Sequence, residues 1–329
     1  MRVLRLLCLA GLLMSLCGCF DYNELNMQEM VSGAGIDAAE NGVRVSVVCA
    51  PTGGIEDKEG KRYTSDGGSF FEAVRELSGF ADKKLYWGHA RCLLIGEDAA
   101  YLTDEILNTV LRVQDVYLDI APVIVKGASA EELIKATPPG GSDVFESISD
   151  MFANEANSRR FFAKRVWEIL RERENSGEYI LPTAALSEGK VHLSGGAVMK
   201  DGNIKGFLDG EQMLLLSLMT ENGAGGYLPT LGLPNGGHAS FEILSNDIKR
   251  EKDGDKTELR VKCVLSPASV QGDGKKEDME QIASKYLDNG FSKLIAYSEK
   301  NGFGDIFGAD GKNLVVKCEV TVSDILGNR

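Results

Sequence analysis

The chain has 329 residues, of which 43% are hydrophobic and 26% are charged, and its formal net charge is −13. A chain of this length and composition can form two or three globular domains with sizeable cores. The excess of acidic residues argues against nucleic acid as a partner and against electrostatic binding to anionic lipid headgroups, because both carry negative charge.

Residues 1–18 are typical of a secretory signal peptide. Arg2 and Arg5 precede an apolar run over residues 6–16, and that run is too short to cross a hydrocarbon core about 30 Å thick as a helix. No later stretch is long and apolar enough to cross a membrane as a helix. We therefore expect contact between the mature chain and a membrane to depend on an attached lipid.

The last four residues of this region, Leu-Cys-Gly-Cys at 16–19, resemble the lipobox of bacterial lipoproteins. In a lipobox, a large apolar residue and two small ones precede a cysteine that is acylated, as with palmitate, and becomes the first residue of the mature chain. The alternative is an ordinary signal peptide with a chance cysteine. The position, the length of the apolar run and the small Gly18 favour lipidation of Cys19.

The sequence between residues 31 and 139 predicts alternating strands and helices, as in an α/β or mixed-sheet domain. Capping boxes of the form Ser-x-x-Glu predict helices that start at Ser69 and Ser129, and apolar spacing predicts a helix around 106–111. Apolar, β-branched runs predict strands over 31–37, 43–51, 84–97 and 116–126. In the third of these strands, we expect Trp87 and His89 to share one face, with His89 in a structural role.

The remaining sequence predicts a helix and then an antiparallel C-terminal half. The helix is expected over 158–174, inside a helical segment 143–175, with one apolar stripe that includes Phe162 and Val166. Later elements are a hairpin turning at Asp201-Gly202, a helix from Asp209, a long hairpin over 239–265, a helix over 279–287 and a strand over 313–322.

These elements predict an α+β fold of several domains, in which mixed sheets are flanked by helices. We expect an N-terminal domain over residues 19–186, which includes the helical segment, and a C-terminal domain over residues 190–329. Two halves are clear from the sequence pattern, and whether the second half is itself subdivided stays open.

Four cysteines remain after Cys19: Cys49, Cys92, Cys263 and Cys318. They are far apart in the sequence and form no Cys-x-x-Cys pair, which argues against a zinc or iron–sulfur site. Cys263 and Cys318 stand on the apolar faces of two predicted strands, where buried free thiols are favoured. A disulfide between these two requires the strands to be neighbours.

The sequence offers no catalytic constellation. None of the three histidines, His89, His192 and His238, stands in a metal-binding or nucleophile-activating pattern. There is no nucleophile elbow, phosphate loop, dinucleotide fingerprint or calcium loop. We therefore predict no catalytic residue, no metal site and no cofactor.

Three segments together resemble the Ger(x)C spore germination lipoproteins, the C subunits of nutrient germinant receptors. The segments are 19–42, with the lipobox cysteine and a Gly-Ile-Asp strand end, 83–98, with Trp-Gly-His and Ile-Gly-Glu, and 195–212, with a hairpin and the helix after it. The chain differs from the family pattern at 304–320, where a longer segment with a basic, Trp-containing helix is usual.

The resemblance implies three α+β domains and a non-enzymatic subunit, anchored by lipid on the outer face of the inner spore membrane. Its implied partners are the receptor's integral A and B subunits, with which it would respond to nutrients. Two other classes stay open: a solute-binding lipoprotein of a transporter, which is usually built from two similar lobes, and a cell-wall enzyme whose paired carboxylates the sequence does not reveal.

Overall fold

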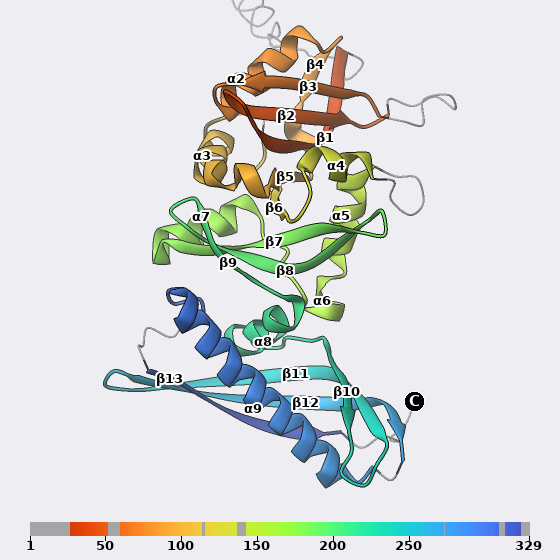
Figure 1. The fold of residues 1–329 in the computed structure, drawn as a ribbon, viewed down its shortest axis with the longest axis vertical. Coiled ribbons are helices and arrows are strands. Elements are labelled where there is room, and N and C mark those ends of the chain that lie inside the picture. The colour runs from red at the N-terminus through yellow and green to blue at the C-terminus, as the bar shows by residue number, and fades with distance from the viewer. Residues whose placement is uncertain are drawn as a thin grey trace, which may run out of the picture.

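The computed structural model describes residues 27–51, 60–113, 116–136, 143–272, 274–308 and 313–323. Within these ranges, nine strands form one sheet and four strands form a second, and the two sheets follow one another along the long axis of the molecule (Figure 1). Both sheets are flanked by helices, so the predicted α+β fold of mixed sheets is confirmed.

The larger sheet has the order β3-β2-β1-β5-β6-β7-β8-β9, with the short β4 beside β1. Its middle strands β1, β5, β6 and β7 are parallel, and antiparallel hairpins extend it on either side. The strands are β1 Gln28–Ala39, β2 Gly42–Cys49, β3 Arg62–Gly67, β4 Lys84–Tyr86, β5 Cys92–Gly96, β6 Ala121–Val125, β7 Glu178–Ser187, β8 Lys190–Lys200 and β9 Asn203–Leu208.

Helices cover both faces of this sheet, and β5 is buried along its whole length because its side chains enter two different cores. One core lies under α2 (Phe70–Glu76), α3 (Thr103–Arg112) and α7 (Val166–Ser176). The other lies under α4 (Ala130–Lys135) and α5 (Val144–Ala153), where Phe145 rests on Gly33. Ser69 caps α2 and Ser129 caps α4, as the sequence predicts.

The smaller sheet has the order β10-β11-β12-β13, and the 26-residue helix α9 (Lys276–Asn301) lies across one of its faces (Figure 1). Its strands are β10 Tyr227–Gly232, β11 His238–Asp253, β12 Lys256–Gln271 and β13 Asn313–Val322. The predicted long hairpin is confirmed as β11 and β12. However, β13 runs parallel to β12, since α9 is a crossover that returns the chain to the same end of the sheet, so the expected all-antiparallel half is wrong.

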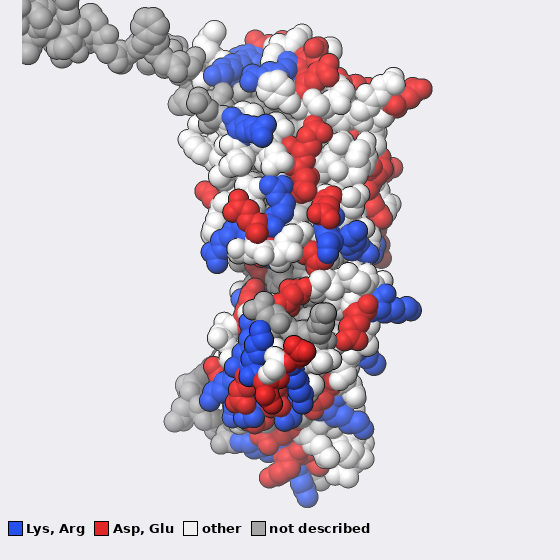
Figure 2. Space-filling model, turned by 90° about the vertical axis from the view of Figure 1, so that its left-hand side faces the viewer, with Lys and Arg blue, Asp and Glu red and all other residues white. Residues whose placement is uncertain are grey.

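The other face of the smaller sheet is charged. Arg260 pairs with Glu251 and Glu258, and Lys317 pairs with Glu258, at N–O distances of 2.9–3.1 Å. Figure 2 shows basic and acidic side chains intermixed over the lower part of the molecule. Exposed pairs of this kind contribute little to stability, roughly 0–1 kcal/mol each. Charged side chains on this face are consistent with its exposure to solvent.

The two sheets share one hydrophobic core around α8 (Gly210–Thr220). Every residue of α8 from Met213 to Met219 is buried, as is typical of a helix that is surrounded by other elements. Met213 faces the larger sheet, where Gly196 of β8 leaves room for its sulfur, and Leu215 contacts α9 at Gly290. Figure 1 shows α8 between the two sheets.

Polar contacts join the end of α9 to the larger sheet. The buried carboxylate of Glu178 accepts hydrogen bonds from Lys200 Nζ at 2.8 Å and from the Gly304 amide at 2.6 Å. Tyr297 donates to the Phe207 carbonyl at 3.0 Å. The sequence-based boundary at residues 187–189 falls in the turn between β7 and β8, which pair with each other, and the division into 19–186 and 190–329 stays a prediction.

The predicted helix over 158–174 is wrong in its first half. The helical segment consists of α5, the short α6 (Glu155–Ser158) and α7, and Arg159 with a left-handed φ of 52° ends α6. Residues 160–165 are not helical, because Phe161 enters the core under α5 while Phe162 enters the core around α8. Consecutive side chains point to opposite sides in extended chain, whereas a helix places them about 100° apart on one side of the chain.

We expect Met213→Ala to destabilise both halves together. Met213 is fully buried, and truncation of such a side chain costs about 2–5 kcal/mol. Leu111→Ala is the control, because Leu111 is 53% exposed and its truncation should change stability by less than about 0.5 kcal/mol.

Urea unfolding measured by two signals tests this expectation. Tryptophan fluorescence reports on the half of the molecule that contains the larger sheet, since Trp87 lies in the turn after β4 and Trp167 lies on α7. Far-ultraviolet circular dichroism reports on the whole chain. The two midpoints should coincide in the wild type and fall together in Met213→Ala. Separate transitions for the two signals would contradict a shared core.

Candidate functional site

Cys19, the site residue predicted from the sequence, lies outside the described residues, which begin at Met27. The predicted motifs of the first half are described, and two of them meet on neighbouring strands. The Gly-Ile-Asp end of β1 and the Ile-Gly end of β5 pair in register, with Ile36 opposite Ile95. The Gly-Ile-Asp motif lies against the N-terminus of α4, and Gly96 of the Ile-Gly motif lies against Asp37.

Close packing explains the glycines of these two motifs. A Cβ atom on Gly35 would lie 2.6 Å from Ile134 of α4, and one on Gly96 would lie 2.5 Å from the Asp37 carboxylate. Both distances are shorter than carbon atoms tolerate, so larger residues would push α4 and Asp37 away. The motifs therefore seat a helix on the sheet.

Asp37 anchors α4 through two hydrogen bonds. Its carboxylate accepts from the Ala130 amide at 2.6 Å and from the Glu131 amide at 2.9 Å. These amides belong to the first turn of the helix, where backbone N–H groups have no partner within the helix. Burial raises the pKa of Asp37, while the two backbone hydrogen bonds act in the opposite direction.

The Trp-Gly-His motif is not part of a strand, so the expected placement of Trp87 and His89 on one strand face is wrong. Residues 87–89 form a single 3₁₀ turn between β4 and β5, in which Trp87 is buried and His89 is exposed. The Tyr86 ring lies over Gly88 and meets the His89 ring edge-on, with centroids 5.7 Å apart. A turn at this point directs Trp87 inward.

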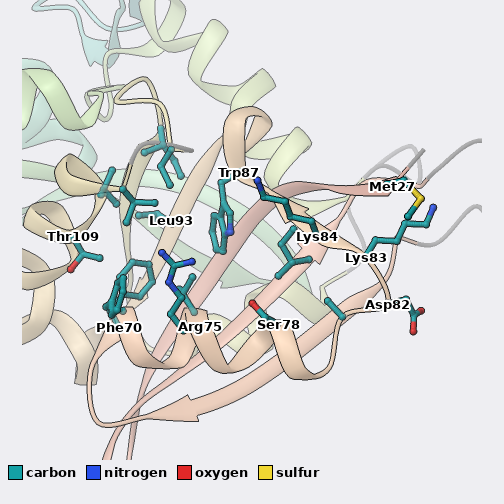
Figure 3. Close-up of a pocket in the computed structure, with 18 residues that line it drawn as sticks. Met27, Phe70, Arg75, Ser78, Asp82, Lys83, Lys84, Trp87, Leu93 and Thr109 are labelled. Atoms are coloured by element: carbon teal, nitrogen blue, oxygen red, sulfur yellow. The ribbon is translucent and has the colours of Figure 1, made fainter. Parts of the chain in front are cut away.

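Trp87 lines an apolar pocket of about 570 Å³ between α2, α3 and β4. Figure 3 shows Phe70, Thr109 and Leu93 at one end of this pocket, Met27, Lys83 and Asp82 at the other end, and Arg75 rising from α2 toward Trp87. The buried part of the lining is hydrocarbon and aromatic, and it includes Phe70, Trp87, Leu93, Val110 and Ile120.

The edge of the pocket is basic. Arg75, Lys83 and Lys84 line it, and Arg75 lies with its guanidinium 5.0 Å from the centre of the Phe71 ring. The acidic lining residue, Asp82, pairs with Lys61 at 2.9 Å. Sequence reasoning missed this pocket, because its residues come from separate elements and each has the spacing of an ordinary core residue.

Comparison with known proteins gives the family. Residues 21–186, about half of the chain, match the pattern of the spore germination protein N-terminal domain. The chain belongs to the Ger(x)C family of spore germination proteins. This Ger(x)C chain is 24% identical over 250 residues to spore germination protein B3 of Bacillus subtilis (strain 168). That alignment covers 72% of the present chain and 66% of the relative, which is just under two thirds of the relative's length.

The fold of this Ger(x)C protein is also that of a solved relative. The crystal structure of the GerBC protein superposes with a TM-score of 0.56 at 16% identity, over 89% of this chain and 97% of that chain. The match spans both sheets, so the multi-domain α+β architecture is shared.

In this Ger(x)C protein, two further cysteines of the larger sheet, Cys49 and Cys92, are buried. Within the described ranges, no three His, Cys, Asp or Glu side chains are grouped as a metal site, and no helix is long and apolar enough to cross a membrane. Burial raises the pKa of Cys49 to about 12 and also raises the pKa of Cys92. High thiol pKa values of this kind make both cysteines poor nucleophiles at neutral pH.

Cys263 and Cys318 lie on neighbouring parallel strands, as a disulfide would require, and the structure has both as free thiols. Cys318 is opposite Val261, and Cys263 is opposite Val320. The hydrogen bond between the two thiols, followed by burial, raises the pKa of Cys318. Both are free thiols on the apolar faces of β12 and β13, which is the arrangement that the sequence favours.

We expect Asp37→Ala to destabilise the protein. The substitution removes the acceptor of two helix N–H groups, and a buried group without a partner costs about 1–3 kcal/mol. Asp37→Asn keeps one acceptor and should cost less. The exposed Glu97 at the end of β5 provides the control, since Glu97→Ala should change the free energy of unfolding by less than about 0.5 kcal/mol. Equal stabilities of the Asp37→Ala and Glu97→Ala proteins in urea would rule out this anchoring role.

Proposed function

We propose that this chain is a lipid-anchored, non-enzymatic subunit of a spore nutrient germinant receptor, equivalent to the C subunit. The observation that carries the proposal is the family match over residues 21–186. In this role the chain acts with the receptor's integral A and B subunits on the outer face of the inner spore membrane.

A lipid on Cys19 would hold the folded part close to that membrane. Met27 is eight positions after Cys19 in the sequence, and eight residues of fully extended chain span at most about 29 Å. Stable anchoring requires two or more acyl chains, as a diacylated cysteine provides. Confinement of this kind raises the effective concentration of the subunit for a neighbouring integral protein, so that a modest interface suffices.

The role of the family motifs supports a non-enzymatic subunit. Gly35, Asp37 and Gly96 seat α4, and Gly196 makes room for Met213 of α8. Each of these residues is explained by packing or by a helix N-terminus, without reference to a substrate. The alternative of a solute-binding lipoprotein is not favoured, because such proteins usually have two similar lobes, and here one sheet has nine described strands in mixed order and the other has four.

The anchor is tested by Cys19→Ala. Acylation and the later removal of the signal peptide both require the thiol, so the variant should keep its full length and lose its stable attachment to the membrane. Fractionation with intact mass measurement checks both features, and Cys17→Ala serves as the matched control that should still be lipidated. A Cys19→Ala protein that is cleaved after Gly18 and stays in the membrane fraction would contradict the anchor.

The receptor role is tested by deletion of the gene in its sporulating host. Spores of the deletion strain should lose the response to at least one nutrient, and the wild-type gene should restore it. Affinity purification of the tagged chain from solubilised spore membranes should recover A-type and B-type subunits. Unchanged germination with every nutrient, together with no such subunit in the purified material, would exclude the proposed function.

A further inference from the structure

The pocket between α2, α3 and β4 opens to solvent beside the exposed Phe71 and Arg75, and its volume is about 570 Å³. That volume lies inside the range of about 300–1,000 Å³ that is usual for small-molecule sites. Its walls come from secondary-structure elements, because Phe70 is the first residue of α2, Val110 belongs to α3 and Leu93 to β5.

The lining determines what can enter. Apart from the charged edge, the polar groups on side chains that line the pocket are the hydroxyls of Ser78 and Thr109 and the indole N–H of Trp87. A peptide segment would carry N–H and C=O groups into a space with few hydrogen-bond partners, and each such group buried alone is costly. A hydrocarbon chain has no such groups and gains free energy with every methylene that it buries.

The basic edge determines the other end of the ligand. Arg75, Lys83 and Lys84 line the pocket on a chain whose formal net charge is −13. The acidic lining residue, Asp82, has Lys61 as its partner, and Lys61 also pairs with Glu29 at 2.7 Å. A carboxylate at the edge of the pocket would therefore meet local positive charge, and Arg75 can donate two parallel hydrogen bonds to it.

We propose that this pocket binds one long-chain fatty acid, with the hydrocarbon chain along Phe70, Trp87 and Val110 and the carboxylate at Arg75. The pocket volume of about 570 Å³ is that of a site for one small molecule, so we assign it a single acyl chain. The proposal is independent of the receptor role, since it concerns the isolated chain.

Trp87 provides a direct signal for binding. The chain has two tryptophans, and Trp167 lies on α7, outside the pocket, with 44% exposure. In the full chain carrying Trp167→Phe, all tryptophan fluorescence comes from the pocket. A stearic acid brominated near the middle of its chain, added below its micelle concentration, should quench this fluorescence and saturate at one molecule per chain.

Chain length and headgroup give two further readouts. The affinity of unbrominated saturated acids, measured by competition, should rise about fourfold for each added methylene until the pocket is full. The alcohol of the same chain length should bind about tenfold more weakly than the acid, because it lacks the charge that Arg75 pairs with. Equal affinities of acid and alcohol would overturn the assignment of the basic edge.

Variants locate the site. Arg75→Gln should weaken the acid about tenfold and leave the alcohol unchanged. Val74→Phe fills part of the pocket from a half-buried position on α2, so the affinity should stop rising at a shorter chain. Arg171→Gln, at an exposed arginine of α7, is the matched control and should bind as the parent does.

Circular dichroism and thermal unfolding establish that each variant is folded before binding is compared. Quenching that does not saturate, or that is the same in the parent, Arg75→Gln and Val74→Phe, would overturn the proposal. Binding of an apolar peptide but of no fatty acid would overturn it as well, because the lining would then accept backbone groups. Loss of nutrient germination in the deletion strain bears on the receptor role alone.

Discussion

The burial of α8 on all sides is the constraint on which the rest of this structure depends. A helix with seven consecutive buried residues cannot be placed at a surface, so the chain must bring a sheet to each side of it. The larger sheet supplies Ile180, Val198 and Leu208 to this core, and the smaller sheet supplies Phe241, Val261 and Leu265. The elongated shape in Figure 1 follows, because each sheet needs its own helices on its remaining faces.

Local signals in the sequence predict many of the elements and fail where the fold places neighbouring residues in different cores. The helix starts at Ser69 and Ser129, the turn at Asp201-Gly202 and the alternation in β12 and β13 depend on residues close in sequence, and these predictions are confirmed, although of the two serines only Ser129 forms a complete capping box. The expected helix over 158–174 fails because Phe161 and Phe162 have the apolar spacing of a helix but enter separate cores. The same apolar spacing fits a helix and an extended segment between two cores, and only the tertiary structure shows which of the two is present.

At the candidate sites, too, the sequence shows some features and the tertiary structure alone shows others. The Gly-Ile-Asp and Ile-Gly motifs are visible in the sequence, but their meeting at α4 depends on the parallel pairing of β1 with β5. The pocket is invisible in the sequence, since Trp87, Phe70 and Val110 each look like core residues. In this protein, the Gly-Ile-Asp and Ile-Gly motifs mark places of close backbone approach, whereas the pocket lies where Trp87 of the Trp-Gly-His motif meets residues of α2 and α3.

The shared core around α8 has a consequence for the order of synthesis. It includes Phe162 near the middle of the chain and Val322 of the last strand. This core is therefore complete only when nearly the whole chain has been synthesised. In addition, β13 pairs with β12 although the 26 residues of α9 lie between them in the sequence. Contacts between residues so far apart in the chain form slowly, and the intermediate that waits for them exposes apolar surface.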